Sequence, residues 1–170
     1  MYVNIENTHS YDVISPELAF KAGESFGNFQ CMLADIPHDE LIETIPDFHN
    51  MEFRLKQFRE AVENNAAGRL AKTQFMVDEI EKRAWEMCAP ERIFREGKLQ
   101  KRINHCDTKV NNMLFDENEE PICIVDLDTV MPGFVLSDFG DFMRTAANTG
   151  TEDDENLENV GINLEIFKAY

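Results

Sequence analysis

The sequence predicts an α+β protein that is mainly helical, with a small cluster of short strands in its second half. Between residues 18 and 88, apolar residues recur at spacings of three and four, as they do on the buried face of helices. After residue 112, two short apolar runs flank a polar turn, and helical spacing then returns. With 170 residues, 43% of them hydrophobic, the chain is long enough to bury a core without disulfide or metal support.

The first half of the chain is expected to contain three or four helices after an opening strand at Tyr2–Ile5. Ser15, Pro16 and Glu17 combine an N-cap side chain, a proline at the first helical position and an early carboxylate, so a helix should begin there. The connector Glu43–His49 is predicted to be irregular and to precede a short helix. Leu70–Cys88 is predicted to form a long amphipathic helix that Pro90 interrupts. One buried stripe is predicted along the first helix, formed by Leu18, Ala22, Phe26, Phe29 and Leu33. The apolar positions of the next two helices are Phe53, Leu55, Phe58, Val62, Phe75, Val77, Ile80 and Trp85.

After Leu99 the periodicity of the apolar residues changes from helical to strand-like. A short strand is predicted at Lys101–Asn104, and Met113–Phe115 with Ile122–Val125 should form a hairpin around a polar turn. No further strand is expected. Phe139–Ala147 carries a helical stripe, an acidic loop follows, and Ile162–Tyr170 begins a last helix.

Charge and cysteine content exclude several classes of function. The chain has 16 Lys and Arg against 33 Asp and Glu, a formal charge of −17, which argues against a nucleic-acid partner. No apolar run approaches the roughly 18 residues of a membrane span, and the first residues lack the features of a signal peptide. The four cysteines form no CxxC pair and have no histidine at zinc-ligand spacing, so a reducing cytoplasm is expected.

The most informative segment is His105–Asn112, which fits the pattern H-x-D-x-K-x-x-N and is followed by Asp126 at the end of an apolar strand. Phosphoryl transfer needs a carboxylate that takes or orients the proton of the attacking hydroxyl, and an amide oxygen and a second carboxylate that hold magnesium. Asp107 fits the first role, and Asn112 and Asp126 fit the second. The predicted hairpin would return Asp126 to the loop that carries Asp107.

Plainer interpretations exist for the residues around this motif. The whole loop could be a polar segment whose carboxylates are hydrogen-bonded locally. His105 could act as a base, but packing beneath the loop with hydrogen bonds to the backbone is favoured. Asp128 is either a second carboxylate near the metal or a side chain bonded within its own turn. Asp141 and Arg144 are expected to form a surface helix pair, and the acidic run 152–155 a solvated face.

Three segments, His105–Asn112, Ile124–Asp128 and Ser137–Asp141, resemble the catalytic half of the aminoglycoside phosphotransferase and choline kinase group. That group shares the protein-kinase-like fold. More narrowly, H-x-D-T-K-x-N-N-x-L-F-D, V-D-L-D-T-V-M-P-G and S-D-F-G-D are similar to N-acetylhexosamine 1-kinases, which phosphorylate the anomeric hydroxyl of GlcNAc or GalNAc with ATP and Mg²⁺. Gly23–Gln30 and Glu43–His49 also resemble that subfamily.

The resemblance implies a role for each matching residue. Asp107 would be the catalytic base, and Lys109 the catalytic-loop lysine whose charge offsets the charge that develops on the transferred group. Asp138 matches the aspartate that braces the catalytic loop, with His105 as a second supporting residue. The magnesium ligands would be Asn112, Asp126 and, secondarily, Asp128. The hinge strand, whose backbone contacts adenine in such kinases, would include Asn4, Ile5 and Glu6.

The sequence departs from that family in two respects. No phosphate loop and no strand lysine for ATP can be placed, and the family continues beyond residue 170. We therefore expect the C-terminal lobe of a kinase without its N-terminal lobe: hinge strand and linker at 1–14, and a helical catalytic lobe, truncated at its C-terminus, at 15–170. Alone, this chain is expected to be inactive.

The leading hypothesis is thus an ATP- and Mg²⁺-dependent kinase of an N-acetylhexosamine. Its alternatives are a kinase of another small hydroxylated substrate (an aminoglycoside, choline or homoserine), a non-catalytic kinase-like binding module and, more distantly, a metal-dependent hydrolase. Intact Asp107, Asn112 and Asp126 argue against the non-catalytic module. A small-molecule sugar and ATP are the expected partners, with neither nucleic acid nor membrane among them.

Overall fold

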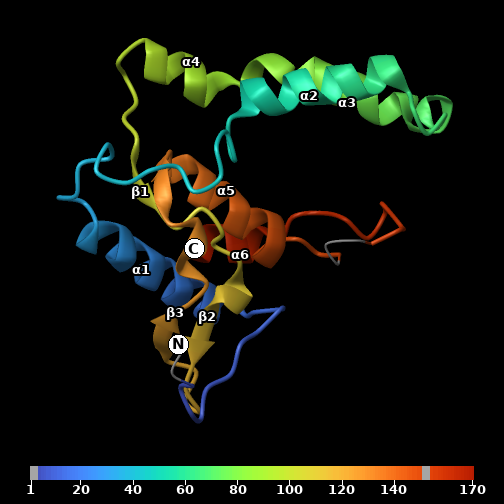
Figure 1. The fold of residues 1–170 in the computed structure, drawn as a ribbon. Helices are drawn as coiled ribbons and strands as arrows, with labels where there is room; N and C mark the ends of the chain where they lie inside the picture. Colours follow the sequence, from blue (N-terminus) through green and yellow to red (C-terminus); the bar gives the residue numbers. More distant parts are fainter. Residues whose placement is uncertain (1–3, 151–153) are drawn as a thin grey trace. The chain divides into compact units, whose positions relative to one another are not determined.

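The computed structural model describes residues 4–150 and 154–170. The chain divides into two compact units: unit 1 comprises Met1–Thr44 and Arg102–Tyr170, and unit 2 comprises Ile45–Lys101. Unit 1 contains the helices α1 (Pro16–Met32), α5 (Val135–Ala146) and α6 (Leu164–Ala169) and the short strands (Figure 1). Unit 2 contains α2 (Met51–Asn64), α3 (Leu70–Met87) and α4 (Ala89–Arg95). The described elements confirm the predicted mixture of helices with a small strand cluster. The proposed roles of residues 1–14 and 15–170 stay predictions.

Helix α1 (Pro16–Met32) begins where the sequence predicts. The Ser15 hydroxyl accepts a hydrogen bond from the Leu18 amide at 3.2 Å, which satisfies one of the free N–H groups of the first turn. Leu18, Ala22 and Phe26 of the predicted stripe are buried, whereas Phe29 and Leu33 are half-buried. The buried residues join one core with Met113, Phe115, Phe142 and Ile166, which come from segments far along the chain.

Helix α1 packs closely against α6 (Leu164–Ala169), the helix predicted near the end of the chain. Tyr170 stacks on Phe142 of α5 (Val135–Ala146) with ring centroids 3.6 Å apart. A Cβ atom at Gly23 would lie 2.8 Å from the Tyr170 carbonyl oxygen, closer than such contacts occur. Gly23 therefore provides the space in which the end of the chain meets α1.

Replacing Gly23 by alanine is expected to destabilise the protein by about 1–3 kcal/mol, because backbone rather than a flexible side chain has to move. Gly27 of the same helix is the matched control, since no atom lies within 4 Å of a Cβ built there. Gly27→Ala should be neutral or stabilise by up to about 1 kcal/mol through helix propensity. Urea unfolding of both variants measures the difference, and equal stability of the two would contradict the close packing.

The predicted hairpin is confirmed. Strand β2 (Met113–Phe115) pairs antiparallel with β3 (Pro121–Ile124), with Met113 opposite Ile124. Oδ1 of Asp116 accepts hydrogen bonds from the amides of Asn118, at 2.8 Å, and Glu120, at 2.9 Å, and so closes the turn. These backbone donors, led by the Glu120 amide, lower the pKa of the Asp116 carboxyl. The hairpin leads directly into the segment that carries Asp126.

A second strand pair was not expected in full. The predicted strand near residue 102 exists as β1 (Arg102–Asn104), but it pairs antiparallel with β4 (Met131–Gly133). The expectation that strands end at Val125 is therefore wrong. Strand β4 was not predicted because it contains Pro132 and Gly133. Both residue types are depleted in strands, and proline lacks the N–H group that donates a hydrogen bond to a neighbouring strand. Opposite β1, β4 holds both ends of the segment 105–130 together.

The opening strand predicted at Tyr2–Ile5 is not found at Asn4 and Ile5, and Tyr2 and Val3 lie outside the described residues. A turn at Glu6 and Asn7 follows, with Asn7 in the left-handed conformation at φ 58°. The pairing occurs later: His9 forms an isolated bridge with Phe115, with N–H···O distances of 2.8 and 2.9 Å. A strand requires a partner for its backbone groups, and this edge of β2 pairs with His9 instead.

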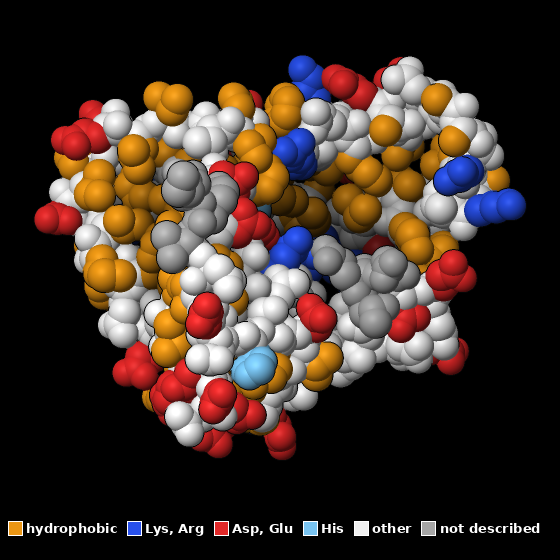
Figure 2. Space-filling model, turned by 60° about the horizontal axis from the view of Figure 1, so that its bottom comes forward, with side chains coloured by type: hydrophobic (Ala, Val, Ile, Leu, Met, Phe, Trp, Pro, Cys, Tyr) orange, Lys and Arg blue, Asp and Glu red, His pale blue; other side chains and the backbone are white. Residues whose placement is uncertain are grey.

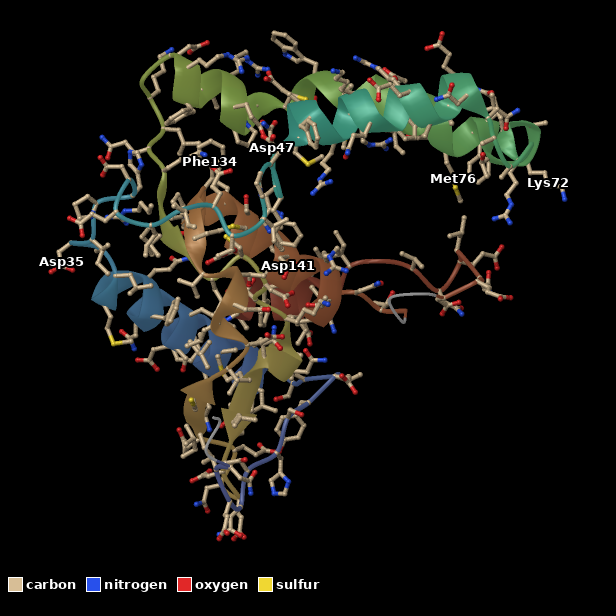
Figure 3. The ribbon with its side chains drawn as sticks, in the orientation of Figure 1. Asp35, Asp47, Lys72, Met76, Phe134 and Asp141 are labelled. Atoms are coloured by element: carbon tan, nitrogen blue, oxygen red, sulfur yellow. The ribbon has the colours of Figure 1, made fainter. Side chains whose placement is uncertain are left out.

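Unit 2 confirms both predicted helices, as α2 (Met51–Asn64) and α3 (Leu70–Met87), and adds α4 (Ala89–Arg95). Asn50 caps α2 by accepting the Phe53 amide at 3.1 Å. Pro90, expected as a helix breaker, lies in the first turn of α4, where no N–H is required. The expectation for α3 was partly wrong, since Phe75 and Trp85 are exposed and Ala84 is the buried residue of the helix. Lys72 and Met76 also extend from α3 (Figure 3).

Within the described residues, no helix is long and apolar enough to cross a membrane. Acidic side chains are widespread on the face shown in Figure 2 and basic ones are sparse, in keeping with the net charge of −17. All four cysteines are free thiols: Cys31, Cys88, Cys106 and Cys123.

Candidate active site

The site is organised around Asp107, on the loop between β1 and a 3-10 turn at Val110–Asn112 (η1). The Asn112 side-chain amide donates to the Asp107 carbonyl at 2.9 Å and to its Oδ2 at 3.0 Å. Lys109 Nζ lies 3.9 Å from Oδ1 of the same carboxylate. About a quarter of the Asp107 side chain is exposed, so the carboxylate is oriented by neighbours and still accessible to a ligand.

His105 lies fully buried beneath this loop. The Asp107 amide donates to Nδ1 at 3.3 Å, which leaves the hydrogen on Nε2, and Nε2 lies 3.0 Å from the Val125 carbonyl oxygen. Both ring nitrogens are thus occupied by backbone groups, in the arrangement of the Nε2–H tautomer. Phe26 packs against the ring edge-to-face, with centroids 5.7 Å apart. The arrangement ties the loop to the end of β3.

Asp138, in the first turn of α5, is buried against the same loop. Its Oδ2 accepts from the His105 amide at 3.1 Å and its Oδ1 from the Cys106 amide at 2.8 Å. Gln30 of α1 adds a third hydrogen bond, from Nε2 to Oδ2 at 3.0 Å, and Thr108 donates to the Asp138 carbonyl at 2.5 Å. This carboxylate therefore fixes the backbone just before Asp107.

Cys106 shows why the loop needs that support. Its φ of 65° places a non-glycine residue in the left-handed region, a conformation that persists only when surrounding contacts impose it. Burial, reinforced by the charge of Asp138, raises the pKa of the Cys106 thiol to about 12. The thiol is therefore protonated near neutral pH and is not a nucleophile.

Asp126 also adopts a left-handed conformation, at φ 62°, just before a second 3-10 turn at Leu127–Thr129 (η2). The preceding residue, Val125, donates its amide to the Asn112 carbonyl at 2.9 Å, which joins the end of the hairpin to the Asp107 loop. A side-chain hydrogen bond with Asp128, and then the charge of that carboxylate, raise the pKa of Asp126. Two carboxyl groups are thus crowded together beside the loop.

The chemistry of these donors suits a hard divalent cation. Mg²⁺ binds to a few carboxylates with water and phosphate oxygens rather than to a complete protein cage. The crowded pair Asp126 and Asp128 supplies two carboxyl groups, and Asn112 directs its NH₂ to Asp107, which leaves its Oδ1 for a cation. No group of three His, Cys, Asp or Glu side chains that could hold a metal is found in the described part of the chain.

Two supporting residues were missed by the sequence analysis. One is Gln30, whose partner Asp138 is 108 positions away, so no local pattern indicates it. The other is Thr129, whose hydroxyl donates to the His105 carbonyl at 2.9 Å and connects η2 with the Asp107 loop. Thr129 directly follows Asp126–Asp128 in the sequence, and this position was the signal that could have indicated its supporting role.

Thr129→Val should destabilise the protein by about 1–2 kcal/mol, because the shape is retained while the His105 carbonyl loses its donor. Thr129→Ser keeps the hydroxyl and should be the milder change. Thermal unfolding of the two variants provides the test, and a valine variant as stable as the serine variant would show that this hydrogen bond contributes nothing.

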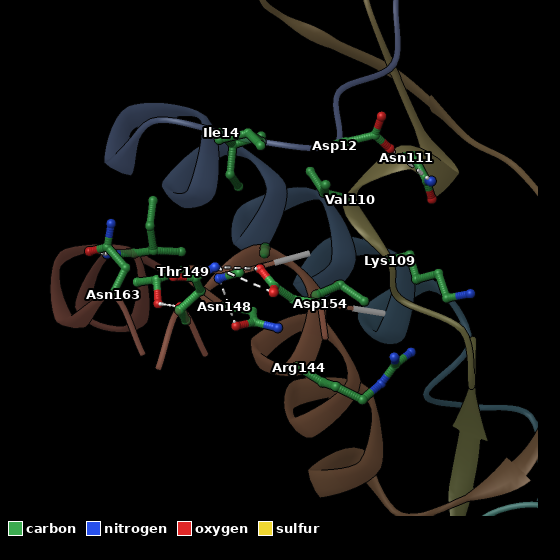
Figure 4. A pocket seen from close by; sticks show the side chains of 16 residues that line it. Asp12, Ile14, Lys109, Val110, Asn111, Arg144, Asn148, Thr149, Asp154 and Asn163 are labelled. Carbon is green, nitrogen blue, oxygen red and sulfur yellow. Dashed lines mark hydrogen bonds between the residues drawn. The ribbon is translucent and has the colours of Figure 1, made fainter. Parts of the chain in front are cut away.

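A cavity of about 780 Å³ lies next to Lys109 within unit 1 (Figure 4). Its buried wall includes Ile14, Val110 and Ile166, and its polar lining includes Asp12, whose Oδ1 accepts from Asn111 at 3.3 Å. Lys109 belongs to both the cavity and the surroundings of Asp107, whereas Asp107, Asn112 and Asp126 do not line the cavity.

Arg144 also lines this cavity and contacts Asp141 at 2.9 Å. The expected surface pair of these two residues needs a correction. Only 9% of the Asp141 side chain is exposed, so this carboxylate of α5 (labelled in Figure 3) faces the interior of unit 1. The amphipathic helix places Asp141 on the same side as buried Asp138, one turn away.

The predicted hinge residues Asn4, Ile5 and Glu6 are exposed, outside any strand. Their contact with adenine stays a prediction, as do the catalytic and metal-binding roles of the loop residues.

Comparison with known families gives one further finding. The model of the phosphotransferase enzyme family, APH, matches residues 2–165. The matched range includes the Asp107 loop, the hairpin, the Asp126–Asp128 segment and Asp138.

Proposed function

Because the chain belongs to the phosphotransferase enzyme family, we propose that it carries the catalytic centre for transfer of the γ-phosphoryl group of ATP to a small-molecule hydroxyl. The observation that supports this most is the geometry around Asp107. An accessible carboxylate is fixed by Asn112, has a lysine ammonium 3.9 Å away, and lies on a loop joined to a pair of carboxyl groups. Catalysis of phosphoryl transfer depends mainly on such positioning and electrostatics.

In the proposed reaction, the acceptor hydroxyl oxygen forms a bond to the γ-phosphorus while the bond from that phosphorus to the β,γ-bridging oxygen breaks. The hydroxyl proton passes to Asp107, and ADP leaves with the bridging oxygen. Lys109 lies beside Asp107, where its positive charge offsets the negative charge that develops on the transferred group. Asp138 and His105 hold the backbone of the loop, so that Asp107 is in place before the acceptor binds.

Mg²⁺ would be held by Asn112 and Asp126, with Asp128 as the secondary ligand. When bound, Mg²⁺ neutralises charge on the phosphate oxygens of ATP. The residues of this chain contribute oxygen donors and a site that is already negative. The side-chain hydrogen bond with Asp128, and after it the negative charge of that carboxylate, raise the pKa of Asp126. A cation bound between the two groups would favour the ionised form of both.

For the acceptor, we propose the anomeric hydroxyl of an N-acetylhexosamine. The resemblance of the segments at 105–116, 125–133 and 137–141 to N-acetylhexosamine 1-kinases supports this choice. The cavity beside Lys109, at about 780 Å³, falls in the range of about 300–1,000 Å³ that is usual for small-molecule sites. Asp107 does not line this cavity, and Lys109, which belongs to both, connects it with the surroundings of Asp107. Its mixture of carboxylate, amide and hydroxyl groups with an apolar wall suits a polyhydroxylated ring.

The test is a substrate panel with the full gene product, ATP and Mg²⁺. N-acetylhexosamines, hexoses, an aminoglycoside, choline and homoserine are compared by ADP release and by ³¹P NMR of the product. Formation of a sugar 1-phosphate from GlcNAc or GalNAc, well above the other acceptors, is the expected result. Preference for choline, homoserine or an aminoglycoside would retain the kinase and reject the sugar. ATP binding without turnover of any acceptor would instead favour the non-catalytic binding module.

A further inference from the structure

Unit 2 contains a second cavity, of about 480 Å³, among α2, α3 and α4. Three arginines and the single tryptophan of the sequence line it, together with two glutamates: Arg59, Arg92, Arg95, Trp85, Glu52 and Glu81. None of these residues belongs to the site around Asp107. The chain has a formal charge of −17, so three guanidinium groups around one small cavity are a marked local concentration of basic residues.

Two of the three arginines are already paired. Arg59 donates to both carboxylate oxygens of Glu81, at 2.8 and 2.6 Å, and Arg95 donates to both oxygens of Glu52, at 2.7 Å each. Such bidentate pairs orient both partners. They lower the pKa of Glu52 and of Glu81, so both carboxylates stay ionised and both pairs are close to neutral.

Arg92 is different. Its guanidinium carbon lies 3.9 Å from the centre of the Trp85 ring, and one of its NH groups donates to the Trp85 carbonyl at 3.1 Å. Within the described part of the chain, it forms no ion pair with a carboxylate. Stacking occupies the face of the guanidinium and leaves the N–H groups of its edge free to bind a ligand. The flat fork of those groups matches the oxygens of a carboxylate or a phosphate.

The remaining groups of the cavity do not cancel this charge. Burial and nearby carboxylates raise the pKa of the Cys88 thiol, so Cys88 stays neutral. Glu91 does not line the cavity, and its Oε1 accepts the Met51 amide at 2.7 Å. The lining therefore holds three positive and two negative charges, and the excess positive charge lies on the unpaired, stacked Arg92.

We propose that this cavity binds an oxyanion, carried by a phosphate ester or a carboxylate, with Arg92 as the recognising residue and Trp85 as the platform that orients it. The flanking pairs Arg59–Glu81 and Arg95–Glu52 hold the walls and widen the positive surroundings of Arg92. The inference rests on unit 2 alone and does not depend on the proposed kinase activity.

Trp85 also provides the measurement, because a chain with one tryptophan reports this cavity by its intrinsic fluorescence. The protein is titrated with inorganic phosphate and, separately, with citrate, at constant ionic strength against sodium chloride. We expect a saturable change in Trp85 emission with at least one of the two anions. The stronger response distinguishes a phosphate-type ligand from a carboxylate-type ligand.

Three variants make the result specific. Arg92→Ala should weaken binding at least about tenfold, the equivalent of one charge-assisted bidentate pair, and Arg92→Lys should weaken it because the fork is lost. Arg83→Ala is the matched control: Arg83 pairs with Glu79 on α3, outside the cavity, and its loss removes the same charge. Circular dichroism checks folding, and ligand-induced thermal stabilisation gives a second measurement that does not depend on Trp85.

Several outcomes would overturn the proposal. They are the absence of any saturable response, an equal response to chloride, equal weakening by Arg83→Ala and Arg92→Ala, and a response to neutral hexoses but not to the anions. The last of these would identify a sugar-stacking site instead.

Discussion

Asp107→Asn is expected to lower kcat by about 10²–10⁴-fold, the range that a positioned general base contributes. Asparagine has nearly the same shape, so its carbonyl oxygen can still accept the Asn112 amide, but it cannot take the proton of the acceptor hydroxyl. The affinity for ATP should change little, since Asp107 is not a proposed ligand of the nucleotide. Steady-state kinetics of the full gene product and a separate measurement of ATP binding distinguish these effects.

Glu117→Gln is the matched control, because it removes the same charge from an exposed position in the β2–β3 turn. Its kcat should equal that of the wild type. If Asp107→Asn leaves kcat unchanged, Asp107 is not the base. Circular dichroism checks the folding of the variant. If Asp107→Asn does not fold, Asp107→Glu, which keeps the carboxylate but moves it, is compared with the wild type instead.

The second large effect is expected at Asp138. Its two carboxylate oxygens accept the His105 amide, the Cys106 amide and the Gln30 side chain within a buried site. Asparagine at this position would direct an NH₂ group toward one of those N–H donors, so at least one buried donor loses its acceptor. We expect Asp138→Asn to lower the free energy of unfolding by about 3 kcal/mol or more.

Gln30→Ala removes only the side-chain hydrogen bond to Asp138. It should lower the free energy of unfolding by about 1 kcal/mol, because both hydrogen bonds from backbone amides to Asp138 remain. Hydrogen exchange gives a residue-level measurement: the amides of His105 and Cys106 should lose protection in Asp138→Asn and retain it in Gln30→Ala. Equal protection in both variants would show that another group holds the loop.

Local patterns predicted the elements whose stability is local. The Ser15 cap with Pro16, and the polar turn that Asp116 closes, are made by residues that are neighbours in the sequence, and the structure has both where they were expected. The Asp107 loop belongs to the same class, because Asn112 reaches Asp107 over only five positions.

Elements that depend on distant partners escaped prediction. Strand β4 exists because β1, nearly thirty positions earlier, pairs with it, although Pro132 and Gly133 disfavour strands. The support of the loop by Gln30 and Thr129 comes from other elements in the same way. In α3, Phe75 and Trp85 are apolar residues at helical positions, but the sequence alone does not indicate which side of the helix packs against other elements. Both residues are exposed.

The order of segments in unit 1 has a consequence for how the protein is made. Lys21 of α1 pairs with Glu120, 99 positions later, and in the sequence all residues of unit 2 come between the two segments that form unit 1. Loop closure over such a distance is costly until many contacts form together. We therefore expect the continuous unit 2 to fold first during synthesis, while α1 stays without its core partners until the ribosome has released the hairpin, α5 and α6. The Asp107 loop would then be among the last parts of the protein to form.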